Sequence, residues 1–178
     1  MDPILLDIKE RKVRNLPCTQ RQKFHRIDRA NREDGFYCKK CNAFVSSSSF
    51  LSGVQNRNHC PYCLYSRHMD LYEAGDRLSA CKSPMKPIGL TTKASRKKYG
   101  AGCGELMLVH LCIDCDSLSI NRIAADDDLE MIAAIFKHSL IMEGSLQRRL
   151  KAEGINILDT AGSSIIQAQL FGSRPEFS

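Results

Sequence analysis

The sequence predicts a small α+β protein stabilised by metal, with zinc-ribbon-type β modules between a basic helical arm and a C-terminal amphipathic helix. The first observation is that cysteines gather in the middle of the chain, nine of them within 178 residues. The second is that aliphatic residues concentrate toward the two ends. A cysteine-rich middle with few long apolar runs cannot bury enough surface on its own, so it depends on metals or disulfides.

The cysteines are expected to be reduced. The N-terminal sequence MDPILLDIKERK does not look like a signal peptide. No stretch approaches the roughly 18–20 apolar residues that a membrane helix needs. These features favour a cytoplasmic location, where Cys-x-x-Cys pairs indicate metal sites rather than disulfides.

Residues 1–33 are predicted to form a basic helical arm. Asp2-Pro3 resembles a helix start, and Pro17 would end that helix before a second one begins at Thr19. The net charge of the whole chain is +6, and residues 1–32 hold nine Lys and Arg against four Asp and Glu. A basic segment can bind nucleic acid, or it can simply be a solvated surface. The candidate contacts in the arm are Arg21, Lys23, Arg26, Arg29 and Arg32.

Residues 36–68 contain the strongest motif. Cys38 and Cys41 form one Cys-x-x-Cys pair, and Cys60 and Cys63 form another after eighteen intervening residues. Zinc prefers four ligands at the corners of a tetrahedron, and two such pairs at this spacing predict a closed structural zinc site. The tetrapeptide Cys60-Pro-Tyr-Cys63 also matches a glutaredoxin-type redox motif. The chain lacks the βαβ pattern that such a motif requires.

A second cysteine module is predicted over residues 69–123. The segments PMKPIGLTTKA and GELMLVHLC, residues 84–94 and 104–112, predict two strands joined by a basic loop with Lys97 and Lys98. Cys112 and Cys115 supply half of a second site. The candidates for the other half are Cys81, Cys103, His59, His68 and His110. We favour Cys81 and His110, since His110 and Cys112 share one face of a strand; His110 can equally be a packed core histidine.

The pattern changes to helical after residue 124. Apolar residues recur at Leu129, Ile132, Ala133, Phe136 and Leu140, which predicts an amphipathic helix running to about Lys151 with a weak point near Gly144. The carboxylates of residues 126–128 suit the helix start, either as caps or as ligands of a divalent metal. Gly154 should end the helix, and the tail from Thr160 is expected to fray.

The sequence resembles the RNHCP domain family of bacterial proteins. The five residues Arg57-Asn58-His59-Cys60-Pro61 spell the motif that names the family, and further similar segments extend over roughly residues 33–128. These segments are GF.C..C at 35–41, RNHCPYCLYSRHMD at 57–70, GDR at 75–77, C...M.PIGL at 81–90, GELMLVHLC..C at 104–115 and NRIA.DD at 121–127.

The resemblance implies a zinc-ribbon-like domain without an established reaction. It implies that Cys81, Cys112, Cys115 and the histidine before Cys112 recur in the family. Cys103 is peculiar to this chain, which weakens it as a ligand. The domain division that follows is an arm over 1–33, a double zinc-ribbon domain over 34–124 and a helical segment over 125–178. We expect zinc at the first site and allow a second zinc.

Three functions compete at this point. The first is binding to RNA or a ribonucleoprotein, carried by the basic arm and by Lys97 and Lys98. The second is a protein-interaction or assembly role for the C-terminal helix. A nuclease using His59, His68, Asp70 and Asn121 is less favoured, because their spacing fits no nuclease motif. Arg57, Asn58 and His59 either contact phosphate or a base, or support the cysteine ligands from behind; we favour support.

Overall fold

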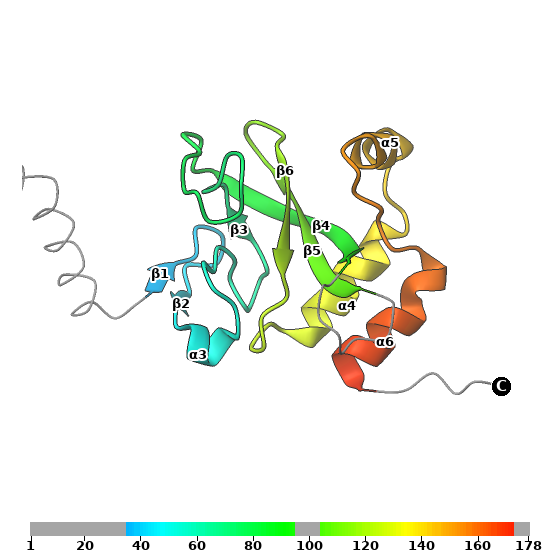
Figure 1. The fold of residues 1–178 in the computed structure, drawn as a ribbon, viewed down its shortest axis with the longest axis horizontal. Coiled ribbons are helices and arrows are strands. Elements are labelled where there is room, and N and C mark those ends of the chain that lie inside the picture. The colour runs from blue at the N-terminus through cyan, green and yellow to red at the C-terminus, as the bar shows by residue number, and fades with distance from the viewer. Residues whose placement is uncertain (1–34, 95–103, 173–178) are drawn as a thin grey trace, which may run out of the picture. The chain divides into compact units, whose positions relative to one another are not determined.

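The computed structural model describes residues 35–94 and 104–172 (Figure 1). Apart from Gly35, the described residues belong to one compact unit, residues 36–178. The basic arm, Cys18, the loop lysines Lys97 and Lys98, and Cys103 lie outside the described residues. In the described part, a two-stranded hairpin and a four-stranded sheet are followed by helices. The small α+β class with antiparallel sheets and clustered cysteines is thus observed.

The four-stranded sheet is antiparallel throughout, in the order β3 (Ser66–Arg67), β4 (Pro84–Lys93), β5 (Glu105–Cys112) and β6 (Leu118–Arg122). Strands β4 and β5 are the two predicted from the sequence. Their register shifts between Pro87 and Gly89. Proline has no N–H to give to the ladder, so within a sheet it is found at edges and bulges.

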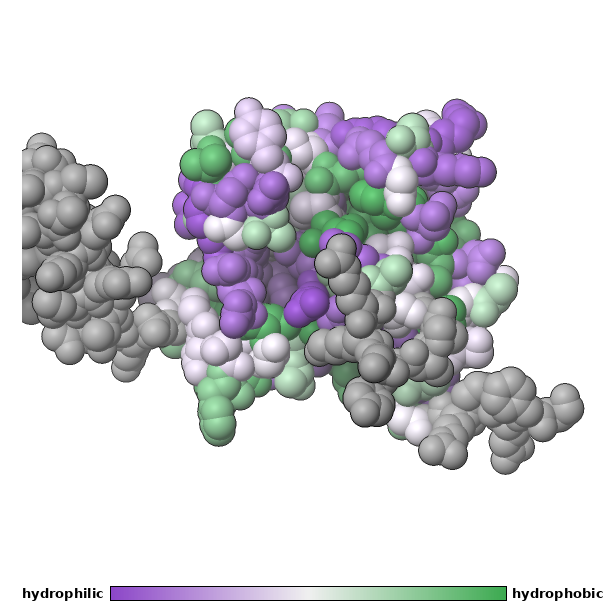
Figure 2. Space-filling model, in the orientation of Figure 1, coloured by the Kyte–Doolittle hydropathy of each residue, from purple (hydrophilic) through white to green (hydrophobic). Residues whose placement is uncertain are grey.

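A smaller hairpin precedes the sheet and consists of β1 (Gly35–Tyr37) and β2 (Phe44–Ser46). The first Cys-x-x-Cys pair lies in the turn between its strands. A one-turn helix, α3 (Ser49–Ser52), follows and exposes Phe50 and Leu51. Figure 2 shows this hydrophobic surface at the lower left of the view.

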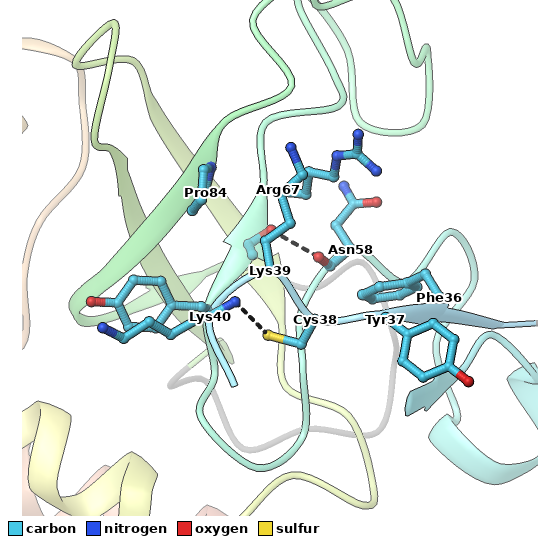
Figure 3. A pocket seen from close by; sticks show the side chains of 10 residues that line it. Phe36, Tyr37, Cys38, Lys39, Lys40, Asn58, Arg67 and Pro84 are labelled. Carbon is cyan, nitrogen blue, oxygen red and sulfur yellow. Dashed lines mark hydrogen bonds between the residues drawn. The ribbon is translucent and has the colours of Figure 1, made fainter. Parts of the chain in front are cut away.

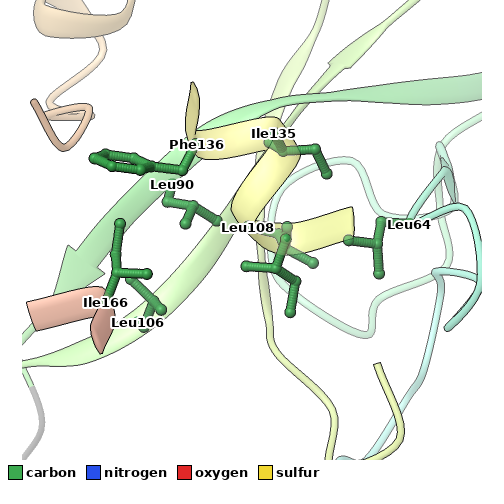
Figure 4. Packing of buried hydrophobic residues seen from close by; sticks show 8 residues of the cluster. Leu64, Leu90, Leu106, Leu108, Ile135, Phe136 and Ile166 are labelled. Carbon is green, nitrogen blue, oxygen red and sulfur yellow. The ribbon is translucent and has the colours of Figure 1, made fainter. Parts of the chain in front are cut away.

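Helix α4 (Leu129–Ser139) packs against β4 and closes the main core. Ile132 and Phe136 are buried, as the apolar spacing predicted, and Ile135 is buried as well. Leu129 and Leu140, which the spacing placed on the same face, are exposed. Figure 4 shows Leu64 and Ile166 at opposite ends of this cluster in the view, with the sheet leucines between them. The core therefore joins three parts of the chain. They are the knuckle, meaning the Cys60–Cys63 turn with Leu64 after it, the sheet and the C-terminal helices. It consists of Leu64, Leu90, Leu106, Leu108, Ile132, Ile135, Phe136 and Ile166.

The helix does not run to Lys151 as expected. It ends at Ser139, and a separate helix, α5, covers Gly144–Ala152. Backbone N–H groups of Ile141 and Met142 donate to carbonyls three residues earlier, which forms a tight turn. The apolar stripe of α4 stops at Leu140, and α5 buries Leu150 separately. Gly154, with φ 75°, follows the end of α5. The surface over α5 is mostly hydrophilic (Figure 2).

The expected fraying from Thr160 is wrong for residues 160–171. A 3-10 turn (Thr160–Gly162) leads into helix α6 (Ser163–Phe171), and Ile166 enters the core. The Asp159 carboxylate caps the turn by accepting the N–H groups of Ala161 and Gly162. Gln169 binds the start of β5, donating to Gly104 O and accepting from Leu106 N. Residues on both sides of position 124 thus share one core.

Asp128 is the N-cap of α4, and replacing it should have a small, defined effect. Its carboxylate accepts the N–H groups of Glu130 and Met131 at 2.9 and 3.0 Å. Asp128→Ala should lower the free energy of unfolding by about 1 kcal/mol, measured by urea denaturation. Asp128→Ser retains a cap and serves as the control. An alanine variant as stable as the wild type would contradict the assignment.

In residues 35–94 and 104–172 we find no helix with the length and apolar character needed to cross a membrane.

Candidate metal centres

The first cluster consists of four sulfur atoms. Cys38, Cys41, Cys60 and Cys63 hold their Sγ atoms within 4.8 Å of one another. Sγ of Cys38 lies 3.6 Å from Sγ of Cys63, and Sγ of Cys41 lies 3.6 Å from Sγ of Cys60. A disulfide needs about 2.05 Å, so these thiols are free. Four thiolates at about 2.3 Å from one zinc ion would lie about 3.8 Å apart, so the separations fit a tetrahedral site.

All three Cys-x-x-Cys turns have the same backbone geometry. In each turn, the N–H of the first cysteine donates to the carbonyl five residues later, at 2.9 to 3.0 Å. The residue after the second cysteine has a left-handed conformation, which closes the turn. These residues are Asn42, Leu64 and Asp116, with φ of 59°, 57° and 58°. Asparagine and aspartate tolerate this conformation better than leucine does.

Burial disfavours the thiolate form of two cysteines in the first cluster. Desolvation raises the pKa of the Cys60 thiol to about 11 and raises the pKa of Cys63 as well. Without an opposing charge, these two sulfurs stay protonated at neutral pH. A zinc ion supplies that charge and binds the deprotonated form. The donor set and its surroundings therefore fit zinc.

The second cluster consists of His68, Cys81, Cys112 and Cys115, whose ligand atoms also lie within 4.8 Å of one another. Nδ1 of His68 is 3.2 Å from Sγ of Cys115, and Sγ of Cys81 is 3.7 Å from Sγ of Cys112. Three cysteines and one histidine are a common donor set for structural zinc. Two clusters in the described part of the chain can thus each hold a zinc ion.

Sheet pairing brings the second cluster together. Strand β3 pairs Ser66 with Met85 of β4, and Met85 in turn pairs with Cys112 of β5. The chain then continues from β3 to His68, whose N–H donates to Ser83 O at 2.8 Å. His68 and Cys81 therefore reach the end of β5 from the same edge. The two-residue strand β3 has no distinct sequence signal, so this placement was not predicted.

His110, which we favoured as the fourth ligand, lies elsewhere. Its Nε2 is 2.8 Å from Leu64 O, to which it donates, so Nδ1 accepts from the Asn121 amide at 3.0 Å. Burial lowers the pKa of His110 to about 3, and the ring is neutral. His110 and Cys112 do share a strand, but two residues extend over about 7 Å. The imidazole binds the backbone that follows the Cys60–Cys63 turn, and His68 takes the place expected for His110 in the second cluster.

The RNHCP segment binds carboxylates rather than sulfur. The Arg57 side chain is fully buried and donates to Asp126 at 2.8 Å and to Asp127 at 3.0 Å. The His59 ring nitrogen Nε2 lies 2.8 Å from the same Asp127 carboxylate, which also accepts the Ala124 N–H. Because Arg57 has no exposed side-chain surface, it cannot contact an external phosphate. Together, Arg57 and His59 fix the segment that enters α4.

Asn58, unlike Arg57 and His59, contacts the loop of residues 70–78. Its amide donates to Asp70 at 3.1 Å and accepts from Arg77. Asp70 also accepts the N–H groups of Gly75 and Arg77. The Asp76 carboxylate accepts four backbone N–H groups, and these bonds hold its pKa well below the usual range. Asn58 therefore anchors the loop of residues 70–78 that leads to Cys81.

Comparison with known proteins identifies a family. A family model described as the RNHCP domain matches residues 33–133. The match covers both cysteine clusters and the Arg57–Asp127 contact. No curated protein and no solved structure matches the chain.

Proposed function

The chain belongs to the RNHCP domain family, and from this premise we propose that it is a zinc protein whose two structural zinc ions hold a scaffold that binds RNA. The observation that carries the zinc part is the pair of four-residue clusters. Each cluster has four protein donors, which leaves no position for water or substrate on the ion. Zinc would stabilise the thiolates and fix the turns, and it would take no part in a reaction.

Charge supports the RNA part of the proposal. The chain has a net charge of +6, and its excess lies largely in residues 1–32. Lys and Arg side chains that contact phosphates release counterions from the nucleic acid, which gives affinity without a deep pocket. Arg26 and Arg29 are the centre of this basic segment, and Lys97 and Lys98 add a second one.

The alternative functions have less support in the described residues. Ile132 and Phe136 pack inside the core, so the apolar face of α4 is not available to a protein partner. The four residues considered for a nuclease each have another contact. His59 binds Asp127, His68 belongs to the second cluster, Asp70 holds a loop and Asn121 binds His110.

Native mass spectrometry of protein purified without chelator tests the zinc assignment. We expect two zinc ions per wild-type chain and one in His68→Ala, because that variant loses a ligand of the second cluster. His138→Ala removes an exposed histidine from α4 and should retain two. Two zinc ions in His68→Ala would show that His68 is not a ligand.

Retention of RNA at low salt tests the RNA-binding part of the proposal. Arg26→Glu combined with Arg29→Glu should weaken binding strongly, since it replaces two phosphate contacts with repulsion. Lys137→Glu with Arg148→Glu makes the same change of charge on exposed positions of α4 and α5. If both pairs weaken binding equally, the basic segment is not the specific contact.

A further inference from the structure

Two cationic side chains meet beside the Cys38–Cys41 turn. Nζ of Lys39, in the turn between Cys38 and Cys41, donates to Lys82 O at 3.3 Å. Nε of Arg67, in β3, donates to the same carbonyl oxygen at 3.2 Å. A carbonyl satisfies a donor but does not neutralise two positive charges. Two positive charges therefore meet at one carbonyl oxygen with no carboxylate of the described residues bound to either.

Several other cationic side chains of the described part form ion pairs with carboxylates, unlike Lys39 and Arg67. Within residues 35–94 and 104–172, ion pairs hold Arg57, Arg77, Arg122 and Arg149, while neither Lys39 nor Arg67 has a carboxylate within 4 Å. Lys40 also lacks one there, and its Nζ lies 5.3 Å from the centre of the Tyr65 ring. Lys39 and the partly exposed Arg67 thus meet at Lys82 O, while Lys40 lies over Tyr65. An anionic partner is what this arrangement complements.

Aromatic rings border the same place. Figure 3 shows a shallow hollow with Phe36 and Tyr37 on one side of Cys38 and Lys40 on the other. The Tyr37 side chain is 72% exposed, and its ring meets Phe44 edge-on at 5.5 Å between centroids. Phe44 holds the ring in place while one face remains available. A flat exposed ring beside cations is the arrangement that proteins use to bind single strands.

We infer that this surface binds single-stranded RNA, with Lys39 and Arg67 contacting phosphates and Tyr37 stacking on an unpaired base. The inference rests on the proposed RNA function and assigns it a site that is separate from the basic arm. A paired base would hide its face from Tyr37, so the ligand must be single-stranded. RNA is the nucleic acid that presents unpaired bases, in its loops, bulges and ends.

Fluorescence anisotropy with a labelled 12-nucleotide single-stranded RNA of mixed sequence tests the site in the full zinc-loaded chain. Lys39→Gln with Arg67→Gln keeps donors for Lys82 O but removes two charges. It should weaken binding roughly tenfold or more at 50 mM KCl, and the slope of log K against log salt should become shallower by about 1.4. Tyr37→Ala should weaken binding by about fivefold or more without changing the slope, and Tyr37→Phe should restore it.

Matched control variants distinguish the loss of this site from the effect of a lower net charge. Lys137→Gln with Lys151→Gln removes the same charge from the helices, and Tyr72→Ala removes a tyrosine that is 82% exposed on another loop. These variants should bind nearly as the wild type does. Equal losses in the controls would overturn the inference, as would tighter binding of the matched DNA strand or equal binding of an RNA duplex. Thermal melting and zinc content verify that each variant is folded.

The outcomes also distinguish this inference from the proposed function. A wild-type chain that binds no RNA would overturn both. RNA binding that depends on Arg26 and Arg29 but is indifferent to Lys39, Arg67 and Tyr37 would overturn the site and leave the proposed function standing. In that case the exposed cations and the ring would belong to an acidic protein partner or to none.

Discussion

Replacing Cys60 with serine should abolish the cooperative unfolding transition of the described unit. Cys60 has no exposed surface, and its N–H and C=O form the two hydrogen bonds that close its knuckle. Structural zinc contributes an apparent free energy of about 10–16 kcal/mol in zinc-finger peptides. Whole domains are stable by only about 5–15 kcal/mol. Loss of the first zinc should therefore remove most or all of the stability of the fold.

Circular dichroism during heating and the zinc count of the same sample measure this effect. The expected result is a broad or absent transition and loss of at least one zinc ion. Cys18→Ser makes the same chemical change at a cysteine that stands alone in residues 1–33, and it should melt as the wild type does. A Cys60→Ser chain with unchanged melting and two zinc ions would refute the first site.

Asp127→Asn should also be strongly destabilising, although Asp127 is not a ligand. Its carboxylate is fully buried and is the shared partner of Arg57 and His59. Removing one member of a buried charge pair leaves the other charge without compensation, which costs about 3–5 kcal/mol. An asparagine of similar shape fills the space but leaves the Arg57 guanidinium with only the half-exposed Asp126.

The adjacent Asp126→Asn provides the control, since it removes a carboxylate bound to the same guanidinium. The Asp126 side chain is 39% exposed, so water screens its contact with Arg57. We expect that it contributes about 1 kcal/mol or less. Urea denaturation of both variants, at equal zinc content, gives the two free energies. Losses of similar size would show that the buried network does not behave as described.

The sequence predicted the features that depend on local pattern. The spacing of Cys38, Cys41, Cys60 and Cys63 predicted a group that the structure brings together. The strands that became β4 and β5, the start of α4 and the RNHCP family membership were also predicted. Each of these depends on a motif or a periodicity that can be recognised in one continuous segment or in one pair of segments.

The predictions that were wrong concern features that depend on packing between distant segments. His68 and His110 could not be distinguished by spacing, because a two-residue strand decides which of them reaches Cys112. The expected helix is interrupted after Ser139, and its second part, α5, buries Leu150 as a separate helix. Ile166 lies in a Ser- and Gly-containing tail, and its burial depends on contact with distant core residues such as Leu106. The carboxylate partners of Arg57 lie about seventy residues away in sequence.

Leu64 has a consequence for how the chain folds in time. It is a fully buried member of the core, and it also holds the left-handed conformation, φ 57°, that closes the knuckle after Cys63. A leucine accepts that conformation only when its surroundings compensate for the steric cost. We therefore expect core collapse and closure of the Cys60–Cys63 turn to be coupled. The refolding rate should rise with free zinc concentration, and a collapsed intermediate lacking metal should not accumulate.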